Sequence, residues 1–224
     1  MRLTSFCRTT LIAGAAAGLL AGCAGMMGQK SDMGFFITSR NPGNGANFGG
    51  LAGADRHCQA LASAAGAGHR TWRAYLSQQE VPGQPGINAR DRIGKGPWRN
   101  AKGEVIATSV AHLHSGSNNI SKQTALTETG AIVNGRGDTP NRHDILTGSQ
   151  PDGSFIAGNV NTTCGNWTQN SADGSAMVGH HDKMGLDNSV PAKSWNSSHQ
   201  SRGCTLPLLR ASGGEGLLYC FAAD

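Results

Sequence analysis

A histidine-rich segment near the C-terminal end holds the densest group of side chains suited to metal binding. His180, His181 and Asp182 are consecutive, and Asp187 and His199 follow them. Imidazole nitrogens combined with carboxylate oxygens are typical zinc ligands. Neighbouring side chains on a strand point to opposite faces, however, and polar clusters of this kind are often solvated or hydrogen-bonded. The segment therefore suggests a zinc site and, as one alternative function, a metal-dependent hydrolase.

An Arg-Gly-Asp triplet lies in a glycine-rich stretch that we expect to be an exposed loop. It consists of Arg136, Gly137 and Asp138. The triplet resembles the integrin-recognition sequence, in which the aspartate reaches a metal on the receptor and the arginine reaches a carboxylate. A motif this short also arises by chance. It defines another alternative function, that of an adhesin binding a host receptor.

Sequence signatures of common enzymes are absent. The chain contains no Gly-x-Ser-x-Gly motif and no glycine-rich phosphate loop. A catalytic triad assembled from distant residues leaves no such signature. We expect a non-enzymatic protein and retain the hydrolase as a minority hypothesis.

Residues 1–22 have the pattern of a bacterial secretory signal. Arg2 and Arg8 charge the start, and an apolar run over residues 11–20 is too short for a bilayer, which takes about 20 residues. Small residues then lead to Cys23 in a lipobox, so we expect Cys23 to be lipidated; an ordinary cleaved signal is the alternative. The residue that follows is not aspartate, which favours the outer membrane. The expected division is a signal peptide at 1–22, a lipid-anchored tether at 23–33 and a binding domain at 34–224.

Composition limits the class of partner. Removing residues 1–22 leaves 202 residues and lowers the net charge from +5 to +3, because two arginines are lost. A mildly basic chain without a Lys/Arg block is not expected to bind nucleic acid. The 33 glycines and few aromatic residues predict a loop-rich domain that gains from cross-links.

Four cysteines follow the lipidation site, which in an exported protein indicates two disulfides. Three pairings are possible. We favour Cys58–Cys220 with Cys164–Cys204, since an apolar strand so close to the chain end needs a tie to the core. No pair has CxxC spacing, which disfavours a cysteine metal site.

Hydrophobic patterning predicts short strands, one clear helix and long loops. The helix, residues 51–65, carries an apolar stripe that turns Cys58 inward. A shorter helix is expected at 88–93, a hairpin at 96–107 and long loops at 108–143 and 180–203. Strands are expected at 33–38, 71–77, 145–147, 163–168, 176–179 and 216–222.

Five stretches, taken in order, carry a resemblance to a known family. They are residues 53–58, 71–77, 148–153, 164–167 and 217–220. Over about residues 34–222 they resemble the endostatin domain of basement-membrane collagens, and bacterial lectin-like lipoproteins look closer still. The resemblance implies an α+β, C-type-lectin-like fold with short antiparallel sheets, two helices, long irregular loops and the nested disulfides. It also implies that the first strand pairs with the last and that the domain binds glycans or matrix proteins.

A calcium site is a further expectation. Gln150 and Asp152 flank a proline and resemble the galactose-type calcium motif of C-type lectins, while Trp195 and Asn196 resemble the second part of that site without its carboxylate. Calcium takes several oxygen ligands of this type. Pro-Asp-Gly is equally a standard turn sequence. Endostatin's own zinc site uses N-terminal histidines, which this chain lacks.

Together these features predict a lipid-anchored protein of the bacterial cell envelope, at the outer membrane. Its lectin-like domain is expected to recognise a glycan or a surface or matrix protein. Ca²⁺ and Zn²⁺ are the candidate ions, and the loops at 108–143 and 180–203 are the expected binding regions.

Overall fold

The structure is a computed structural model that describes residues 31–224. The expected signal peptide, the lipidation site Cys23 and most of the expected tether lie outside these residues. Within the described part of the chain, no helix combines the length and apolarity needed to cross a bilayer.

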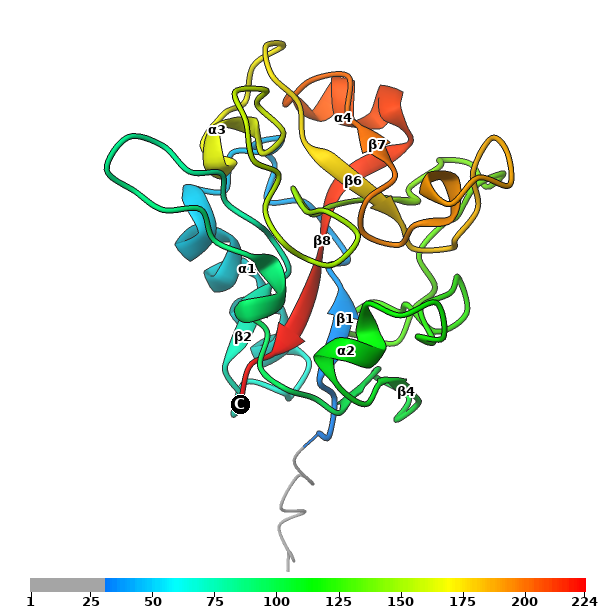
Figure 1. Ribbon diagram of the computed structural model, residues 1–224. Coiled ribbons are helices and arrows are strands. Elements are labelled where there is room, and N and C mark those ends of the chain that lie inside the picture. The colour runs from blue at the N-terminus through cyan, green and yellow to red at the C-terminus, as the bar shows by residue number, and fades with distance from the viewer. Residues whose placement is uncertain (1–30) are drawn as a thin grey trace, which may run out of the picture.

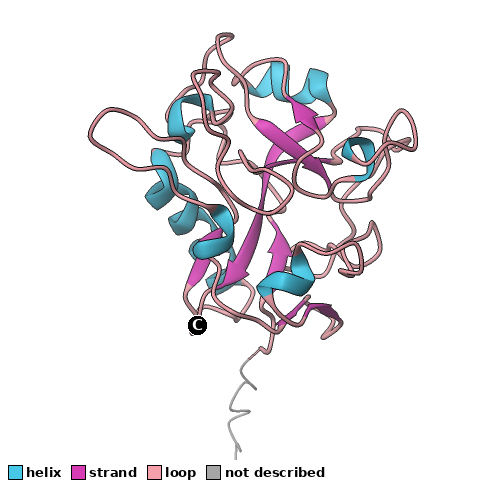
Figure 2. Ribbon diagram, in the orientation of Figure 1, coloured by secondary structure: helices cyan, strands magenta, loops and turns pink. Residues whose placement is uncertain are grey.

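The described chain is a mixed α+β protein with short helices and strands joined by long loops, as Figure 2 shows. The helices are α1 (Gly50–Ala64), α2 (Val110–Leu113), α3 (Cys164–Trp167) and α4 (Leu206–Ser212), with 3-10 turns η1 (Ala89–Asp91) and η2 (Pro191–Lys193). The strands are β1 (Phe35–Ile37), β2 (Trp72–Ala74), β3 (Trp98–Arg99), β4 (Val105–Ala107), β5 (Asp144–Leu146), β6 (Met177–His180), β7 (His199–Gln200) and β8 (Gly214–Ala222).

The long C-terminal strand β8 is the axis of the main sheet (Figure 1). Its second half pairs antiparallel with β1 and with β2, so the first strand lies beside the last, as expected. Its first half pairs in parallel with β5, and β6 and β7 continue the sheet from there. Strands β3 and β4 form the predicted hairpin, as a separate two-stranded sheet.

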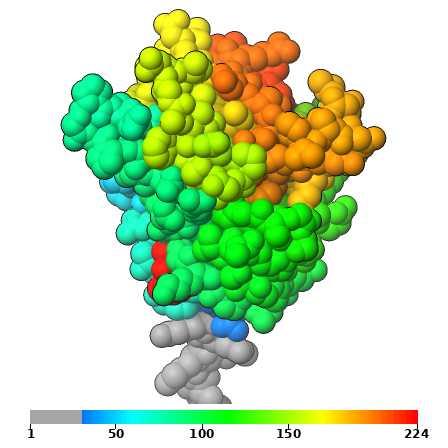
Figure 3. Space-filling view, in the orientation of Figure 1, coloured from blue at the N-terminus to red at the C-terminus, as the bar shows by residue number. Residues whose placement is uncertain are grey.

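The alternation of side chains along β8 divides the core into two halves. Leu218 and Cys220 point to one face, where they pack with α1 and Trp72. Leu217, Tyr219 and Phe221 point to the other face and join an aromatic cluster. Loops cover both halves, and in Figure 3 little of the red C-terminal segment reaches the surface on this side.

The favoured disulfide pairing is confirmed. Cys58 of α1 is bonded to Cys220 of β8, and Cys164 of α3 is bonded to Cys204 just before α4. All four cysteines are fully buried. The predicted inward stripe of α1 thus places Cys58 against the central strand.

Several sequence expectations were wrong in detail. The described chain has four helices in place of the expected two, and the main sheet includes one parallel pair, β5–β8, in place of antiparallel pairing throughout. The strand expected at 163–168 is the tight turn α3, whose four residues have φ of 49°, 60°, 54° and 66°, a left-handed conformation. The loop expected at 180–203 contains β7 and η2, and that expected at 108–143 contains α2. Helix α4 was missed, although Thr205 caps its start and Gly213 ends it.

Candidate metal centre

Three neighbouring strands bring histidines and an aspartate to one edge of the main sheet. Asp144 begins β5 and lies directly opposite His180, the last residue of β6. His199 begins β7, which pairs with β6 on its other side. His143 immediately precedes β5. Directly opposed residues on antiparallel strands share a face, so the β5–β6 pairing places Asp144 beside His180. His199 lies opposite Val178, two residues before His180 and on the same face of β6.

All three imidazoles turn the same nitrogen toward the Asp144 carboxylate. The Nε2 atoms of His143, His180 and His199 lie 3.1, 3.3 and 3.6 Å from Asp144 Oδ1. Ligand atoms from His143, Asp144 and His180 all lie within 4.8 Å of one another. These three residues are at most 4 % exposed, whereas the side chain of His199 is 42 % exposed. The group is therefore buried on three sides and open at His199.

The opposite nitrogen of each ring faces a hydrogen-bond acceptor. His180 Nδ1 lies 2.8 Å from the Ala192 carbonyl oxygen, and His199 Nδ1 lies 3.0 Å from that of Gln200. His143 Nδ1 lies 3.3 Å from Asp182 Oδ1. In the tautomer with the proton on Nδ1, each ring donates outward to its acceptor and presents the lone pair of Nε2 inward. An outward bond from Nδ1 to a carbonyl or carboxylate is the usual arrangement of a metal-bound histidine.

Inside the cluster, polar atoms are buried without partners. Both carboxylate oxygens of Asp144 and the Nε2 of His180 form no hydrogen bond of acceptable geometry. Lone pairs aimed at a buried carboxylate repel it unless a proton or a cation lies between them. A tetrahedral zinc site with bonds of about 2.0–2.1 Å separates its ligand atoms by about 3.3 Å, close to the distances of His143 and His180 from Asp144. His199, at 3.6 Å, borders the group of ligand atoms that lie within 4.8 Å of one another. The residues present fit a zinc ion.

Contacts within the cluster favour the charged forms of its groups. Burial by itself raises the pKa of the Asp144 carboxyl, but its contacts with His180 and His199 lower it overall. The same contact with Asp144 raises the pKa of His199. For Asp182, burial likewise opposes ionisation, yet bonds from His143 and from the Arg136 and Met184 amides hold its pKa well below the usual range. Both carboxylates are thus anionic at neutral pH.

A pocket of about 410 Å³ opens over the cluster. Its lining includes His143, His180 and His199, which form its floor. The walls carry Arg136 and Arg202, together with apolar residues such as Leu186, which is 88 % exposed. A metal at this position would be reachable from solvent.

The structure brings together only part of the predicted zinc set. His180 and His199 take part, but His181 points the opposite way, and its Nε2 lies 3.1 Å from the Asn134 carbonyl oxygen. Asp182 contacts the outer ring nitrogen of His143, Nδ1, and does not face the other histidines. His143 and Asp144 were missed; the available signal was an adjacent His-Asp pair at the start of a predicted strand.

The predicted calcium residues are engaged in other contacts. Asp152 accepts bonds from Ser154 and pairs with Arg90 at 2.6 Å. The Asn196 amide donates to the Tyr75 hydroxyl and to the carbonyl oxygens of Gln150 and Pro151. The Gln150 side chain donates to Phe155, and Trp195 is buried against Tyr75 and Tyr219. These residues form a turn that is held by internal hydrogen bonds.

The Arg-Gly-Asp triplet is only partly available to a partner. Asp138 pairs with Lys122 at 2.6 Å and accepts a bond from the Gly135 amide, and both contacts lower its pKa. Arg136 is exposed and lines the pocket over the metal centre. The two charged ends of the triplet therefore serve different contacts.

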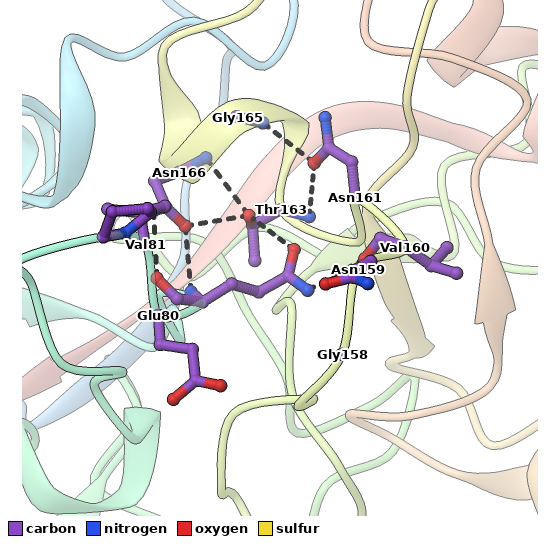
Figure 4. A pocket seen from close by; sticks show the side chains of 11 residues that line it. Glu80, Val81, Gly158, Asn159, Val160, Asn161, Thr163, Gly165 and Asn166 are labelled. Atoms are coloured by element: carbon purple, nitrogen blue, oxygen red, sulfur yellow. Dashed lines mark hydrogen bonds between the residues drawn. The ribbon is translucent and has the colours of Figure 1, made fainter.

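A second pocket, of about 360 Å³, lies beside the left-handed turn α3. Figure 4 shows Thr163 at its centre, between Asn161 and Asn166. Asn166 and Gln79 bond to each other through backbone and side chain, and Thr163 bonds to both. Because these polar groups satisfy one another, the pocket is a weaker candidate than the histidine cluster.

No family model matches the chain, and no curated protein matches its sequence.

Proposed function

We propose that this chain is an exported zinc-binding protein whose metal centre, His143, Asp144, His180 and His199, holds a ligand in the pocket above it. The observation that carries the proposal is the set of three inward-facing Nε2 atoms around a buried carboxylate with no other partner. Export is supported by the signal pattern of residues 1–22 and by two buried disulfides.

The lectin-like class and the lipid anchor at Cys23 remain part of this proposal. The α+β fold, the β1–β8 pairing and the nested disulfides are compatible with a C-type-lectin-like domain. In this proposal the domain stands on the bacterial envelope, and zinc, in place of calcium, mediates binding of a glycan or a surface protein. The adhesin alternative has less support, because Asp138 is paired with Lys122.

A metal-dependent hydrolase is the second candidate. The observation in its favour is the contrast between three buried ligands and the half-exposed His199. Catalytic zinc sites have three protein ligands and a water molecule in the fourth position. If His199 leaves the ion, water can take its place. Turnover of aryl esters or phosphate esters that is lost on chelation and in Asp144→Asn would favour this candidate.

The direct test is the zinc content of the purified full chain. After zinc loading and gel filtration, we expect one tightly bound zinc ion per chain. The molar ratio of zinc to protein is measured by elemental mass spectrometry. Asp144→Asn and His180→Gln should abolish stable binding, because each removes a ligand. Asp182→Asn should weaken binding by about 10- to 100-fold in a chelator competition, because Asp182 only orients His143.

Two histidine variants serve as controls. His181→Gln, next to the ligand His180, and His69→Gln, in an exposed loop, should both retain zinc. A wild-type chain that leaves the column without zinc would contradict the proposal. So would zinc that stays bound in Asp144→Asn and His180→Gln.

A further inference from the structure

Two arginines from different segments face the pocket over the metal centre. Arg136 belongs to the loop before β5, and Arg202 follows β7. Both side chains are exposed, and the arginine ion pairs of residues 31–224 involve neither of them. Their guanidinium groups are therefore available to a ligand in the pocket.

The backbone of Arg136 is linked to the metal centre through Asp182. Its amide donates to Asp182 Oδ2 at 2.6 Å, while Asp182 Oδ1 lies 3.3 Å from His143 Nδ1. The Gly135 amide donates to Asp138, which pairs with Lys122 and fixes the other side of the loop. Arg202 is held by a bond from its own amide to Ser212 Oγ at 2.8 Å. Hydrogen bonds thus fix the backbone of both arginines at the edge of the pocket.

The charges around the pocket do not cancel. The two positive charges of a zinc ion would be balanced by Asp144 and Asp182. Arg136 and Arg202 add two more, and the acidic residue of the pocket wall, Asp187, offsets one of them. One positive charge is left over, next to a metal that accepts oxygen ligands.

We propose that the pocket binds an oxyanion, with one oxygen on the metal in the position of the half-exposed His199 and the others on Arg136 and Arg202. Phosphate and carboxylate groups share this chemistry, since both accept paired hydrogen bonds from a guanidinium. The ligand would thus be an anionic compound or an acidic modification of a larger molecule. This inference rests on the proposed zinc centre.

The test is calorimetric titration of the zinc-loaded full chain, freed of unbound zinc, with inorganic phosphate and, separately, with acetate. We expect binding of at least one of the two anions, and the stronger binder identifies the group. Arg136→Gln and Arg202→Gln should each weaken it by about tenfold, since each removes a charge-assisted hydrogen bond. Arg56→Gln removes the same charge from an exposed site on α1 and should change nothing.

Zinc content measured in parallel separates this inference from the proposed function. One zinc per chain with neither anion bound would overturn the oxyanion site alone. Anion binding of equal strength in the metal-free chain, or in a double variant of both arginines, would also overturn it. Absence of zinc from the wild-type chain would overturn the metal centre itself.

Discussion

At the scale of single residues, His114 illustrates how burial fixes a protonation state. Its Nδ1 lies 2.8 Å from the Val110 carbonyl oxygen, and its Nε2 lies 2.7 Å from the Tyr75 hydroxyl. Asn196 donates to that same hydroxyl, so the Tyr75 proton points to His114. The chain of bonds is complete only when His114 is neutral. Burial lowers the pKa of His114, while bonding to Val110 and the nearby Asp152 oppose the change.

This environment predicts acid sensitivity. Below an unfolded-state pKa of about 6.5, the unfolded chain binds a proton at His114 that the folded chain resists. The free energy of unfolding should therefore fall as the pH drops from 7 toward 5. His114→Gln, which does not titrate, should show a shallower fall in urea denaturation, whereas His69→Gln should follow the wild type. Parallel pH profiles for wild type and His114→Gln would contradict this account.

At the scale of elements, strand β6 approaches the loop after η2 very closely. A Cβ atom on Gly179 would lie 1.8 Å from the Trp195 carbonyl oxygen, so no side chain fits at this position without moving backbone. The next residue is His180, whose place in the candidate metal centre depends on the course of β6.

Gly179→Ala should therefore affect stability and zinc binding together. Overpacking of this kind costs about 1–3 kcal/mol in the free energy of unfolding. We expect a loss in that range by urea denaturation, together with weaker zinc retention. Gly116→Ala is the matched control, since a Cβ there meets nothing within 4 Å. Unchanged stability in Gly179→Ala would show that the two segments are further apart than described.

The elements also show which parts of the structure the sequence could predict. The apolar run of β8 and the stripe of α1 have local periodicities, so both elements were predicted. The burial of Asp55, beside the stripe, was not, because it depends on ion pairs with Arg73 and Arg92 from other segments. The turn α3 was not found, because its backbone is left-handed and is held by tertiary bonds. The candidate metal centre was only half found, because Asp144 meets His180 through the β5–β6 pairing, which no local pattern encodes.

At the scale of the whole molecule, the two disulfides close loops of very different length. Cys58–Cys220 joins residues 162 apart in sequence, and Cys164–Cys204 joins residues 40 apart. In the chain-entropy model the longer loop contributes about 5 kcal/mol and the shorter about 4 kcal/mol to the free energy of unfolding.

Replacing both cysteines of one pair by alanine should thus destabilise the protein by several kcal/mol in either case. We expect the Cys58/Cys220 variant to be less stable than the Cys164/Cys204 variant by about 1 kcal/mol. Urea denaturation of the two double variants compares them directly. The reverse order would mean that local packing around each bond, and not loop length, determines its contribution.

The orientation of β8 also determines which end of the molecule carries the candidate metal pocket. Asp144 pairs with Gly214 at the start of this strand, whereas the Ala222 amide at its end donates to Gly34 near the start of the described chain. Nine extended residues separate these poles by about 25 Å. A domain held near Gly34 or Ala222 would carry the candidate metal pocket at the opposite end of β8.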